Sequence, residues 1–430
     1  MRSLEKIICL MKKKLKNELN KETKSSFTQT DNKQKADKGN QTQKNLRAKR
    51  PASDTSQPTT VKRPRINAAQ HKNNKTQSLI ACALETLHDA SYDLLSTNWV
   101  SALLKGSCKL PGLTDEEKSV TSVFCVNKCL TETFLTVILD KIKAEKKSHN
   151  VLQFLCRVYV ALCQQRGDSH KVHTLAYRLL KEDFPEAPKL IMVMVTAWPC
   201  VFSYDAPLCR AIHIVTKMKA GGDILCLLSK YLHWDRVPPG NICSTITSTL
   251  KALLEDKRLT FQKSRWYGED LCPTAWDYVF SLDLLCAQLG WMWTDTHVIR
   301  KRVWLILNTW LLETQTKRRQ FRNVSVAAVI RLLGRLGQQG LKENLAASVE
   351  NLTKSIIEFG TQKVLEDMPW EVQLSLIYAS HDLAPSNPKT TLKTLQLWQQ
   401  KFTKPVPPAV TKCISQISFL SSKKKPTNVF

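Results

Sequence analysis

Apolar residues recur at helical spacing from Gln77 to Leu420, whereas the first 76 residues show almost no such pattern. Side chains at i, i+3, i+4 and i+7 share one face of a helix, so this spacing predicts successive amphipathic helices. Alternating strand patterns and Asn-Gly hairpin turns are absent from the sequence. We therefore predict one all-α domain over 77–421. It is expected to be an irregular array of antiparallel helix pairs, similar in shape to HEAT repeats or an α-solenoid but without a strict repeat.

Local signals mark several of these helices. Thr114 with Glu117 has the spacing of a capping box at a helix start. Residues 188–198 are apolar on all sides, which predicts a buried central helix. Thr296 is expected to precede another helix. The three glycines at every third position of 334–340 predict that a helix ends there and turns against a close neighbour.

The two ends of the chain differ from this body. Residues 20–76 contain few aliphatic side chains, so we expect a disordered basic linker, and 422–430 reads as a disordered basic tail. The pattern over residues 1–19 predicts a short basic amphipathic helix. Three roles are open for it: it could become ordered on a partner, form the last turns of a coiled coil, or lie on a membrane surface. Its apolar stripe contains Leu4, Ile7, Ile8, Met11, Leu15 and Leu19.

Positive charge is concentrated near the N-terminus. Residues 1–76 hold 20 Lys and Arg against 6 Asp and Glu, a net charge of +14, and the remaining residues hold 44 against 31, a net charge of +13. A basic extended segment favours non-specific RNA or DNA contact through the phosphate backbone. The longest apolar runs are too short for a membrane span, and the N-terminus is too rich in lysine for a secretory signal.

Two basic clusters lie within this linker. Lys49-Arg50 and Lys62-Arg63-Pro64-Arg65 flank eleven mostly small or polar residues. A spacer of this length in an extended chain lets each cluster enter a separate acidic groove of a nuclear import receptor. We predict a bipartite nuclear import signal consisting of Lys49, Arg50, Lys62, Arg63 and Arg65.

A second short motif precedes these clusters. Thr28-Gln29-Thr30 resembles the strand that adds to the edge of a dynein light chain dimer. A dynein light chain is therefore a candidate partner of this segment.

Aromatic residues gather in the second half of the body. Most of the tryptophans between 266 and 310 are expected in the core, and some could anchor an interface. They are Trp266, Trp276, Trp291, Trp293, Trp304 and Trp310. One predicted surface loop mixes basic and aromatic side chains that could contact nucleic acid or a partner, namely Lys257, Arg258, Lys263, Arg265, Trp266 and Tyr267.

Reactive constellations are not apparent in the sequence. The fourteen cysteines lie mainly inside apolar segments, which favours reduced, buried thiols in a cytosolic or nuclear compartment. His170 and His173 lie near Cys163, but no fourth ligand follows at a suitable spacing. We expect no catalytic residues, no metal and no cofactor, although a Cys–His nucleophile pair could still meet in space.

Four stretches resemble a known family. They are AWDYVFSLDLLCAQLGWMWT (275–294), VIRLLGRLGQQGLKEN (329–344), MPWEVQLSLIYASHDLAPSNP (368–388) and VPPAVTKCI (406–414). Together they resemble the C-terminal domain of little elongation complex subunit 1, also called interactor of ELL subunit 1. They are packing and turn motifs without a catalytic signature.

The resemblance implies a nuclear scaffold of Cajal or histone locus bodies. Such a scaffold would join an ELL-type elongation factor and a second little-elongation subunit to RNA polymerase II at small nuclear RNA genes. The chain is shorter than full members of the family. It could be a truncated paralogue, a partial gene model or a short isoform. We therefore expect it to keep only the contacts of the C-terminal module. An RNA-binding helical adaptor and an enzyme with an unrecognised pocket remain alternatives.

Overall fold

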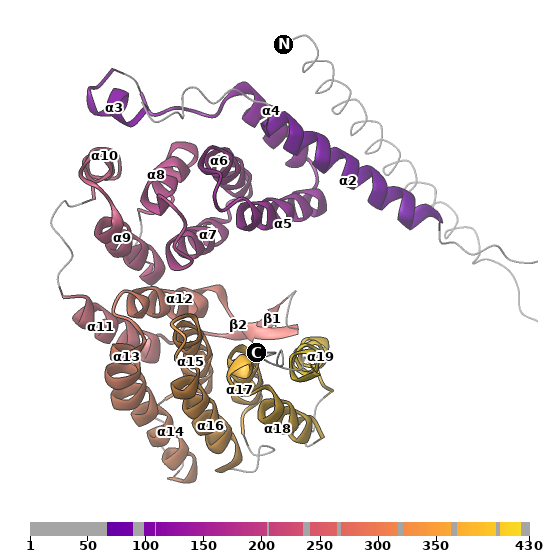
Figure 1. Cartoon of the computed structure of the whole chain (residues 1–430), viewed down its shortest axis with the longest axis vertical. Helices are drawn as coiled ribbons and strands as arrows, with labels where there is room; N and C mark the ends of the chain where they lie inside the picture. The colour runs from indigo at the N-terminus through magenta and orange to yellow at the C-terminus, as the bar shows by residue number, and fades with distance from the viewer. Residues whose placement is uncertain are drawn as a thin grey trace, which may run out of the picture. The chain divides into compact units, whose positions relative to one another are not determined.

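The computed structural model describes residues 67–88, 99–107, 109–203, 206–234, 241–264, 268–316, 321–362, 368–400 and 405–422. These ranges form helices joined by turns and loops, with one two-stranded hairpin, which confirms the predicted all-α fold (Figure 1). Where the sequence suggests one domain over 77–421, the chain divides into two compact units. Unit 1 combines Met1–Ser96 with Gly112–Arg166, and unit 2 combines Thr97–Pro111 with Gly167–Phe430.

Unit 1 is built around one buried helix. Helices α4 and α5 both pack against α6, and α2 packs against α4. Every residue of α6 from Leu152 to Cys163 is buried, so this helix forms the core of the unit. The bounds are α2 (Asn67–His88), α4 (Asp115–Phe124), α5 (Lys128–Ala144) and α6 (His149–Arg166).

Helix α4 begins with the predicted capping box. The Thr114 side chain accepts a hydrogen bond from the Glu117 amide, and the Glu117 carboxylate accepts one from the Thr114 amide at 2.8 Å. The same carboxylate forms a fully buried ion pair with Arg157 of α6, at 2.8 Å. Arg157 also donates to the Gly112 carbonyl oxygen. One carboxylate thus starts a helix and joins two elements of the core.

Helix α2 begins earlier than the sequence pattern indicates. It starts at Asn67, ten residues before the predicted first helix at Gln77 and inside the segment expected to be a disordered linker. Residues 67–76 contribute no apolar stripe, so the hydrophobic pattern of the sequence does not reveal these additional turns. Burial of Ile80, Ala83 and Leu87 anchors the helix from its other end.

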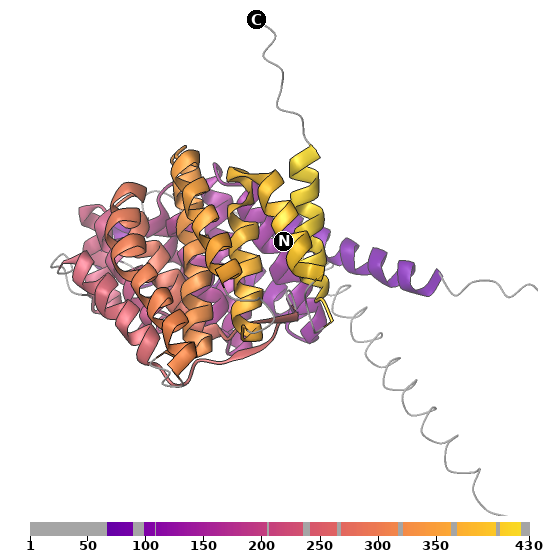
Figure 2. The same cartoon turned by 90° about the horizontal axis from the view of Figure 1, so that it is seen from below.

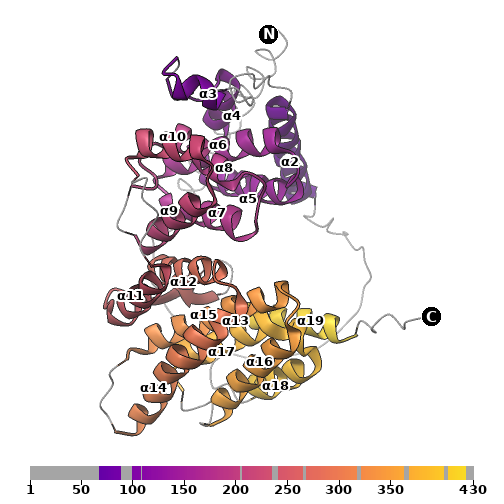
Figure 3. The same cartoon turned by 60° about the vertical axis from the view of Figure 1, so that its left-hand side comes forward.

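Unit 2 is a longer helical array. Helix α12 contacts α7 and α9 on one side and α11 and α15 on the other, and α15 packs most extensively against α17. The orange to yellow helices of its second half stand in a row (Figure 2), and α15 to α18 lie side by side (Figure 3). Its helices are α3 (Trp99–Leu104), α7 (Ser169–Lys181), α8 (Ala187–Ala197), α9 (Pro207–Lys219), α10 (Gly222–Leu232), α11 (Ile242–Glu255), α12 (Pro273–Ala287), α13 (Trp291–Thr294), the π-helix η2 (Asp295–Val303), α14 (Trp304–Thr316), α15 (Asn323–Lys342), α16 (Ala346–Gln362), α17 (Trp370–Leu383), the 3₁₀ turn η4 (Ala384–Ser386), α18 (Pro388–Gln400) and α19 (Pro408–Ser422).

Helix α8 confirms the prediction of a buried central helix. Every residue from Ala187 to Ala197 is buried, and the helix contacts α7, α9 and α10. An apolar surface on all sides leaves no face for solvent, so neighbouring helices surround α8 within unit 2.

The glycine triplet of α15 has a different role from the predicted one. The helix runs through all three positions to Lys342, so the expected helix end at 334–340 is wrong. The predicted close approach is present: a Cβ at Gly334 would lie 2.9 Å from the Ala379 Cα of α17. A Cβ at Gly340 would lie 2.6 Å from a Val349 methyl carbon and 2.8 Å from the Trp291 ring. The glycines therefore allow neighbouring elements to approach α15.

A hairpin replaces part of the predicted surface loop. Strand β1 (Phe261–Ser264) pairs antiparallel with β2 (Gly268–Leu271), with Phe261 opposite Leu271 and Ser264 opposite Gly268. The surface loop expected over 257–267 therefore contains the strand β1. Strands of four residues are too short for their alternation to stand out in the sequence.

Helices α13, η2 and α14 form one continuous helical segment from Trp291 to Thr316. The prediction that a helix starts after Thr296 is wrong, because Thr296 lies inside the π-helix η2. A π-helix bonds each residue to the fifth along the chain and occurs often at functional sites. Apolar spacing alone does not distinguish it from an α-helix.

Candidate partner-docking groove

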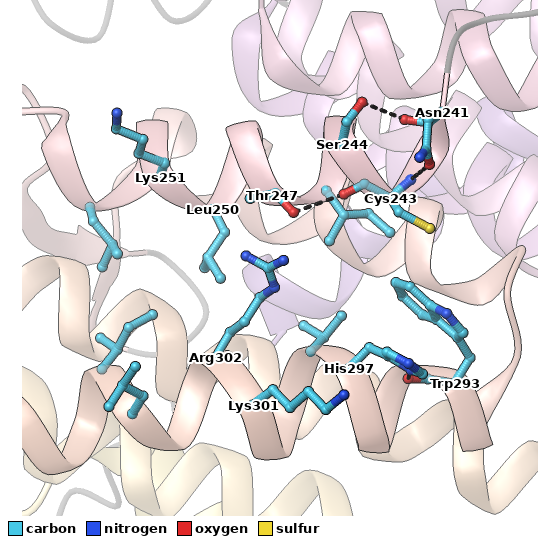
Figure 4. Close-up of a pocket in the computed structure, with 15 residues that line it drawn as sticks. Asn241, Cys243, Ser244, Thr247, Leu250, Lys251, Trp293, His297, Lys301 and Arg302 are labelled. Carbon is cyan, nitrogen blue, oxygen red and sulfur yellow. Dashed lines mark hydrogen bonds between the residues drawn. The ribbon is translucent and has the colours of Figure 1, made fainter.

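A surface groove runs between α11 and the segment formed by α13, η2 and the start of α14, all within unit 2 (Figure 4). Its volume is about 920 Å³. The lining residues are Asn241, Cys243, Ser244, Ile246, Thr247, Leu250, Lys251, Leu254, Trp293, His297, Val298, Lys301, Arg302, Leu305 and Ile306.

The first wall is one face of α11. Lining residues from Cys243 to Leu254 recur at steps of three and four, which places them on one stripe of the helix. Asn241 begins the helix, and its side-chain oxygen accepts a hydrogen bond from the Cys243 amide at 2.9 Å. The Ser244 hydroxyl donates to the Asn241 carbonyl and the Thr247 hydroxyl donates to the Cys243 carbonyl. These polar groups serve the local backbone.

The second wall owes its shape to the π-helix. Its lining residues recur every four positions: Trp293, then the pairs 297–298, 301–302 and 305–306. A π-helix has more residues per turn than an α-helix, so residues four and five apart share its face. The Trp293 and His297 rings stack with centroids 4.9 Å apart, and His297 Nδ1 lies 3.1 Å from the Trp293 carbonyl oxygen. This stack occupies one end of the wall (Figure 4).

The floor of the groove is apolar. Ile246, Leu250, Val298 and Ile306 line the groove and are buried. Leu305 lines the same groove but is 65% exposed. Large exposed aliphatic side chains beside a hollow are typical of interaction surfaces.

The rim of the groove is basic. Lys251, Lys301 and Arg302 are exposed along it, and no carboxylate lies among the lining residues of the described chain. Lys251 forms a solvent-exposed ion pair with Glu255 at 3.8 Å, which contributes little. Lys301 and Arg302 make no ion pair with any residue that the structure describes. The groove thus combines an apolar floor with positive edges.

The predicted basic and aromatic loop is only partly described. Arg258 is exposed and forms a bidentate ion pair with Asp256, whose pKa is lowered chiefly by this hydrogen bonding. The Lys257 carbonyl accepts a hydrogen bond from Arg322 at 2.6 Å. Lys263 belongs to β1, and Arg265, Trp266 and Tyr267 lie outside the described residues. Because Asp256 already compensates Arg258, this loop is a weaker candidate for a binding surface than the groove.

The other predicted site residues belong to the N-terminal segment before α2. The import residues Lys49, Arg50, Lys62, Arg63 and Arg65 and the Thr28-Gln29-Thr30 motif lie outside the described ranges. The amphipathic helix expected over 1–19 and the tail from 423 also lie outside them. These remain predictions from the sequence.

A buried Cys–His pair does occur in unit 2. Cys209 Sγ lies 3.3 Å from His173 Nε2, which in turn lies 2.6 Å from the Val201 carbonyl oxygen. Burial raises the pKa of the Cys209 thiol to about 12, and burial also lowers the pKa of His173. A nucleophilic cysteine needs a low pKa and access to substrate, so this pair suits packing rather than catalysis.

His170, the other histidine considered as a ligand, lies 3.0 Å from Asp277. Within the described ranges, no group of three or more His, Cys, Asp or Glu side chains could hold a metal ion. No helix in those ranges is both long enough and apolar enough to cross a membrane.

The predicted tryptophans differ in their surroundings. Trp291 and Trp310 are fully buried, as expected for core residues, whereas Trp276 and Trp304 are half-buried. Trp293 lines the groove, and Trp266 lies outside the described residues. In the sequence, Trp293 is one of six tryptophans between 266 and 310, and nothing there distinguishes it as a groove residue. The regular stripe of α11 was visible in the sequence, but its pairing with a helix about forty residues further along was not.

The described fold and groove belong to an all-α helical-array protein with an apolar, basic-edged surface. Residues 226–417 match the family described as little elongation complex subunit 1, C-terminal domain. The chain therefore carries the C-terminal domain of this family, which confirms the resemblance found in the four sequence motifs. The whole groove lies inside the matched residues.

Two relatives extend the similarity beyond that domain. Little elongation complex subunit 1 of Homo sapiens is 35% identical over 354 residues, which cover 80% of this chain and 15% of the human protein. Its counterpart in Mus musculus is 35% identical over 348 residues, covering 80% of this chain and 16% of the mouse protein. The chain thus spans about a sixth of the length of these relatives. No solved structure matches significantly.

Proposed function

We propose that this chain is a non-enzymatic nuclear scaffold that acts as a C-terminal module of the little elongation complex. The observation that carries this proposal is the 35% identity to human little elongation complex subunit 1 across 80% of the chain. An alignment that covers 80% of the chain includes part of unit 1 as well as the matched C-terminal domain. Both units would therefore share the role. The relatives are named as subunits of a complex, which favours binding over catalysis.

The proposed partners follow from the family resemblance. They are a second little-elongation subunit, an ELL-type elongation factor and, through them, the RNA polymerase II machinery at small nuclear RNA genes. The proposed location is the nucleus, in Cajal or histone locus bodies, with entry through an import receptor. The groove of unit 2 offers an exposed apolar surface of the kind that subunit interfaces cover.

Affinity purification of the tagged full chain from nuclei tests this role. We expect recovery of the second little-elongation subunit and the ELL-type factor, identified by mass spectrometry. Cross-linking in the purified complex should attach these proteins to residues 67–422. Recovery of neither protein from an extract in which the full-length relative does recover them would contradict the proposal.

The basic N-terminal segment favours a second candidate function, an RNA-binding helical adaptor. Its net charge of +14 over residues 1–76 would attract a phosphate backbone. Binding through phosphates releases counterions, so the affinity for single-stranded RNA should fall steeply as salt rises. A titration without salt dependence would reject this alternative.

A further inference from the structure

We infer that the groove between α11 and η2–α14 binds an acidic amphipathic helix of another protein. The inference rests on the proposed function only in taking the chain as an interaction module. It identifies the class of partner segment and the surface that receives it.

The shape of the groove suits a helix. Its lining on α11 extends from Cys243 to Leu254, a rise of about 16 Å, or three helical turns. Both walls are helices, so a third helix can place its side chains between theirs. Helix-in-groove recognition requires an apolar stripe at steps of three and four on the incoming segment.

The apolar floor favours a partner helix that presents an apolar face. Leu305 projects from the second wall with 65% of its surface exposed, and Leu312 lies seven residues further on α14 with 66% exposed. Residues seven apart lie on the same face of a helix, so Leu312 continues the line of Leu305. An incoming helix would remove this apolar surface from water, which a phosphate backbone cannot do.

The basic rim favours a partner helix with negatively charged side chains. Lys251, Lys301 and Arg302 border the floor, and no lining residue is acidic within the described chain. Acidic side chains flanking the apolar stripe of a helix would meet these cations at both edges. The chain's own N-terminal segment, with a net charge of +14, and a second copy, with +27, carry the wrong sign.

Nucleic acid fits the groove less well for a related reason. The exposed aliphatic side chains offer a base no aromatic platform, and Trp293 is already stacked on His297. The three cations lie around an apolar floor, where a bound phosphate would place its charge against hydrocarbon.

Defined peptide probes test this inference on the full chain. The first is a fluorescent helical peptide of roughly 20 residues with a leucine stripe at steps of three and four flanked by glutamates. The second replaces the glutamates by lysines, and the third replaces the leucines by serines. Fluorescence anisotropy should show that the first binds at least about tenfold more tightly than either of the others.

Substitutions in the groove locate the binding. Lys301→Glu combined with Arg302→Glu should weaken the acidic probe about tenfold, and so should Leu305→Asp alone. Lys389→Glu combined with Lys393→Glu makes the same charge change on exposed positions of α18, and Leu397→Asp makes the same apolar change there. These controls should leave the affinity within about twofold. Circular dichroism confirms that all variants fold.

Three outcomes would overturn the inference. One is equal binding of the glutamate and lysine peptides, or no binding of the acidic peptide below about 1 mM. Another is equal loss in the α18 controls, which would indicate general charge attraction. The third is displacement of the peptide by single-stranded RNA, combined with an RNA affinity that depends on Lys301 and Arg302 but not on Leu305. That result would indicate a nucleic-acid surface.

The nuclear purification separates this inference from the proposed function. If the acidic peptide binds as expected but no elongation-complex protein is recovered, the groove assignment stands and the transcription role fails. If the complex is recovered and the peptide does not bind, the role stands and the groove assignment fails.

Discussion

At the scale of single residues, one buried polar cluster connects three helices of unit 2. Tyr177 of α7 donates a hydrogen bond to Asp283 of α12 at 2.5 Å and accepts one from Arg335 of α15 at 2.7 Å. Lys181 donates to the same carboxylate at 2.9 Å. Burial raises the pKa of the Tyr177 hydroxyl, so it stays protonated and keeps donating. The cluster fixes how α7, α12 and α15 align.

We predict that Tyr177→Phe destabilises the protein by about 1–3 kcal/mol, because Asp283 and Arg335 each lose a buried partner. Urea denaturation followed by circular dichroism measures the change. Tyr231→Phe is the matched control, since the Tyr231 hydroxyl makes no hydrogen bond within the described residues. It should change stability by less than about 0.5 kcal/mol. Equal effects of the two substitutions would show that the cluster contributes nothing specific.

His173 makes stability depend on pH. Its burial disfavours the imidazolium and lowers its pKa in the folded state. The unfolded chain therefore takes up the proton first, and stability present above about pH 6.5 is lost as the pH falls. We predict a lower urea midpoint at pH 5.5 than at pH 7.5, and a smaller difference in His173→Gln. A difference of the same size in the variant would assign the pH effect to other groups.

At the scale of elements, the close packing of α15 against α17 depends on a residue without a side chain. A Cβ at Gly334 would lie 2.9 Å from the Ala379 Cα and 3.1 Å from the Asp382 carboxylate, so α15 or α17 would have to shift. We predict that Gly334→Ala destabilises the protein by about 1–3 kcal/mol despite the better helix propensity of alanine.

Gly222→Ala provides the comparison for this prediction. Gly222 begins α10, and nothing lies within 4 Å of the position its Cβ would take. Its substitution should be neutral or stabilising by up to about 1 kcal/mol. Thermal unfolding of both variants measures the contrast, and a stable Gly334→Ala protein would mean that the two helices pack less closely.

Elements whose signals are local were predictable from the sequence. The capping box at Thr114 and Glu117 depends on residues three apart, and the burial of α8 follows from its own composition. Glycine is common at helix ends, so the sequence alone predicts a helix end at the glycines of α15. Their actual role depends on other elements, with Ala379 lying close to Gly334 and Trp291 close to Gly340. The π-helix and the groove also depend on distant packing, since α11 and η2 meet only in the folded chain.

At the scale of the whole molecule, positive charge is distributed unevenly along the chain. The segment 1–76 carries as much net positive charge as the remainder of the chain, which is more than four times longer. The folded body therefore presents its positive charge locally, as at the groove, while the N-terminal segment concentrates it. We expect the two regions to act separately, the body through shaped surfaces and the segment through receptors that recognise basic clusters.

This separation leads to a prediction for nuclear entry. Changing Lys62, Arg63 and Arg65 to Ala should move the fluorescently tagged full chain from the nucleus to the cytoplasm, because the larger of the two basic clusters would be lost. Fluorescence microscopy of living cells measures the nuclear fraction.

The control changes Lys12, Lys13 and Lys14 to Ala, which removes the same charge from the same segment but leaves both clusters intact. The control should remain nuclear, since the receptor recognises the spacing of the clusters and not the total charge. If both variants leave the nucleus together, entry depends on charge alone. If both remain nuclear, the chain enters with a partner. The groove variants, Lys301→Glu combined with Arg302→Glu and Leu305→Asp alone, then show whether that partner binds through unit 2.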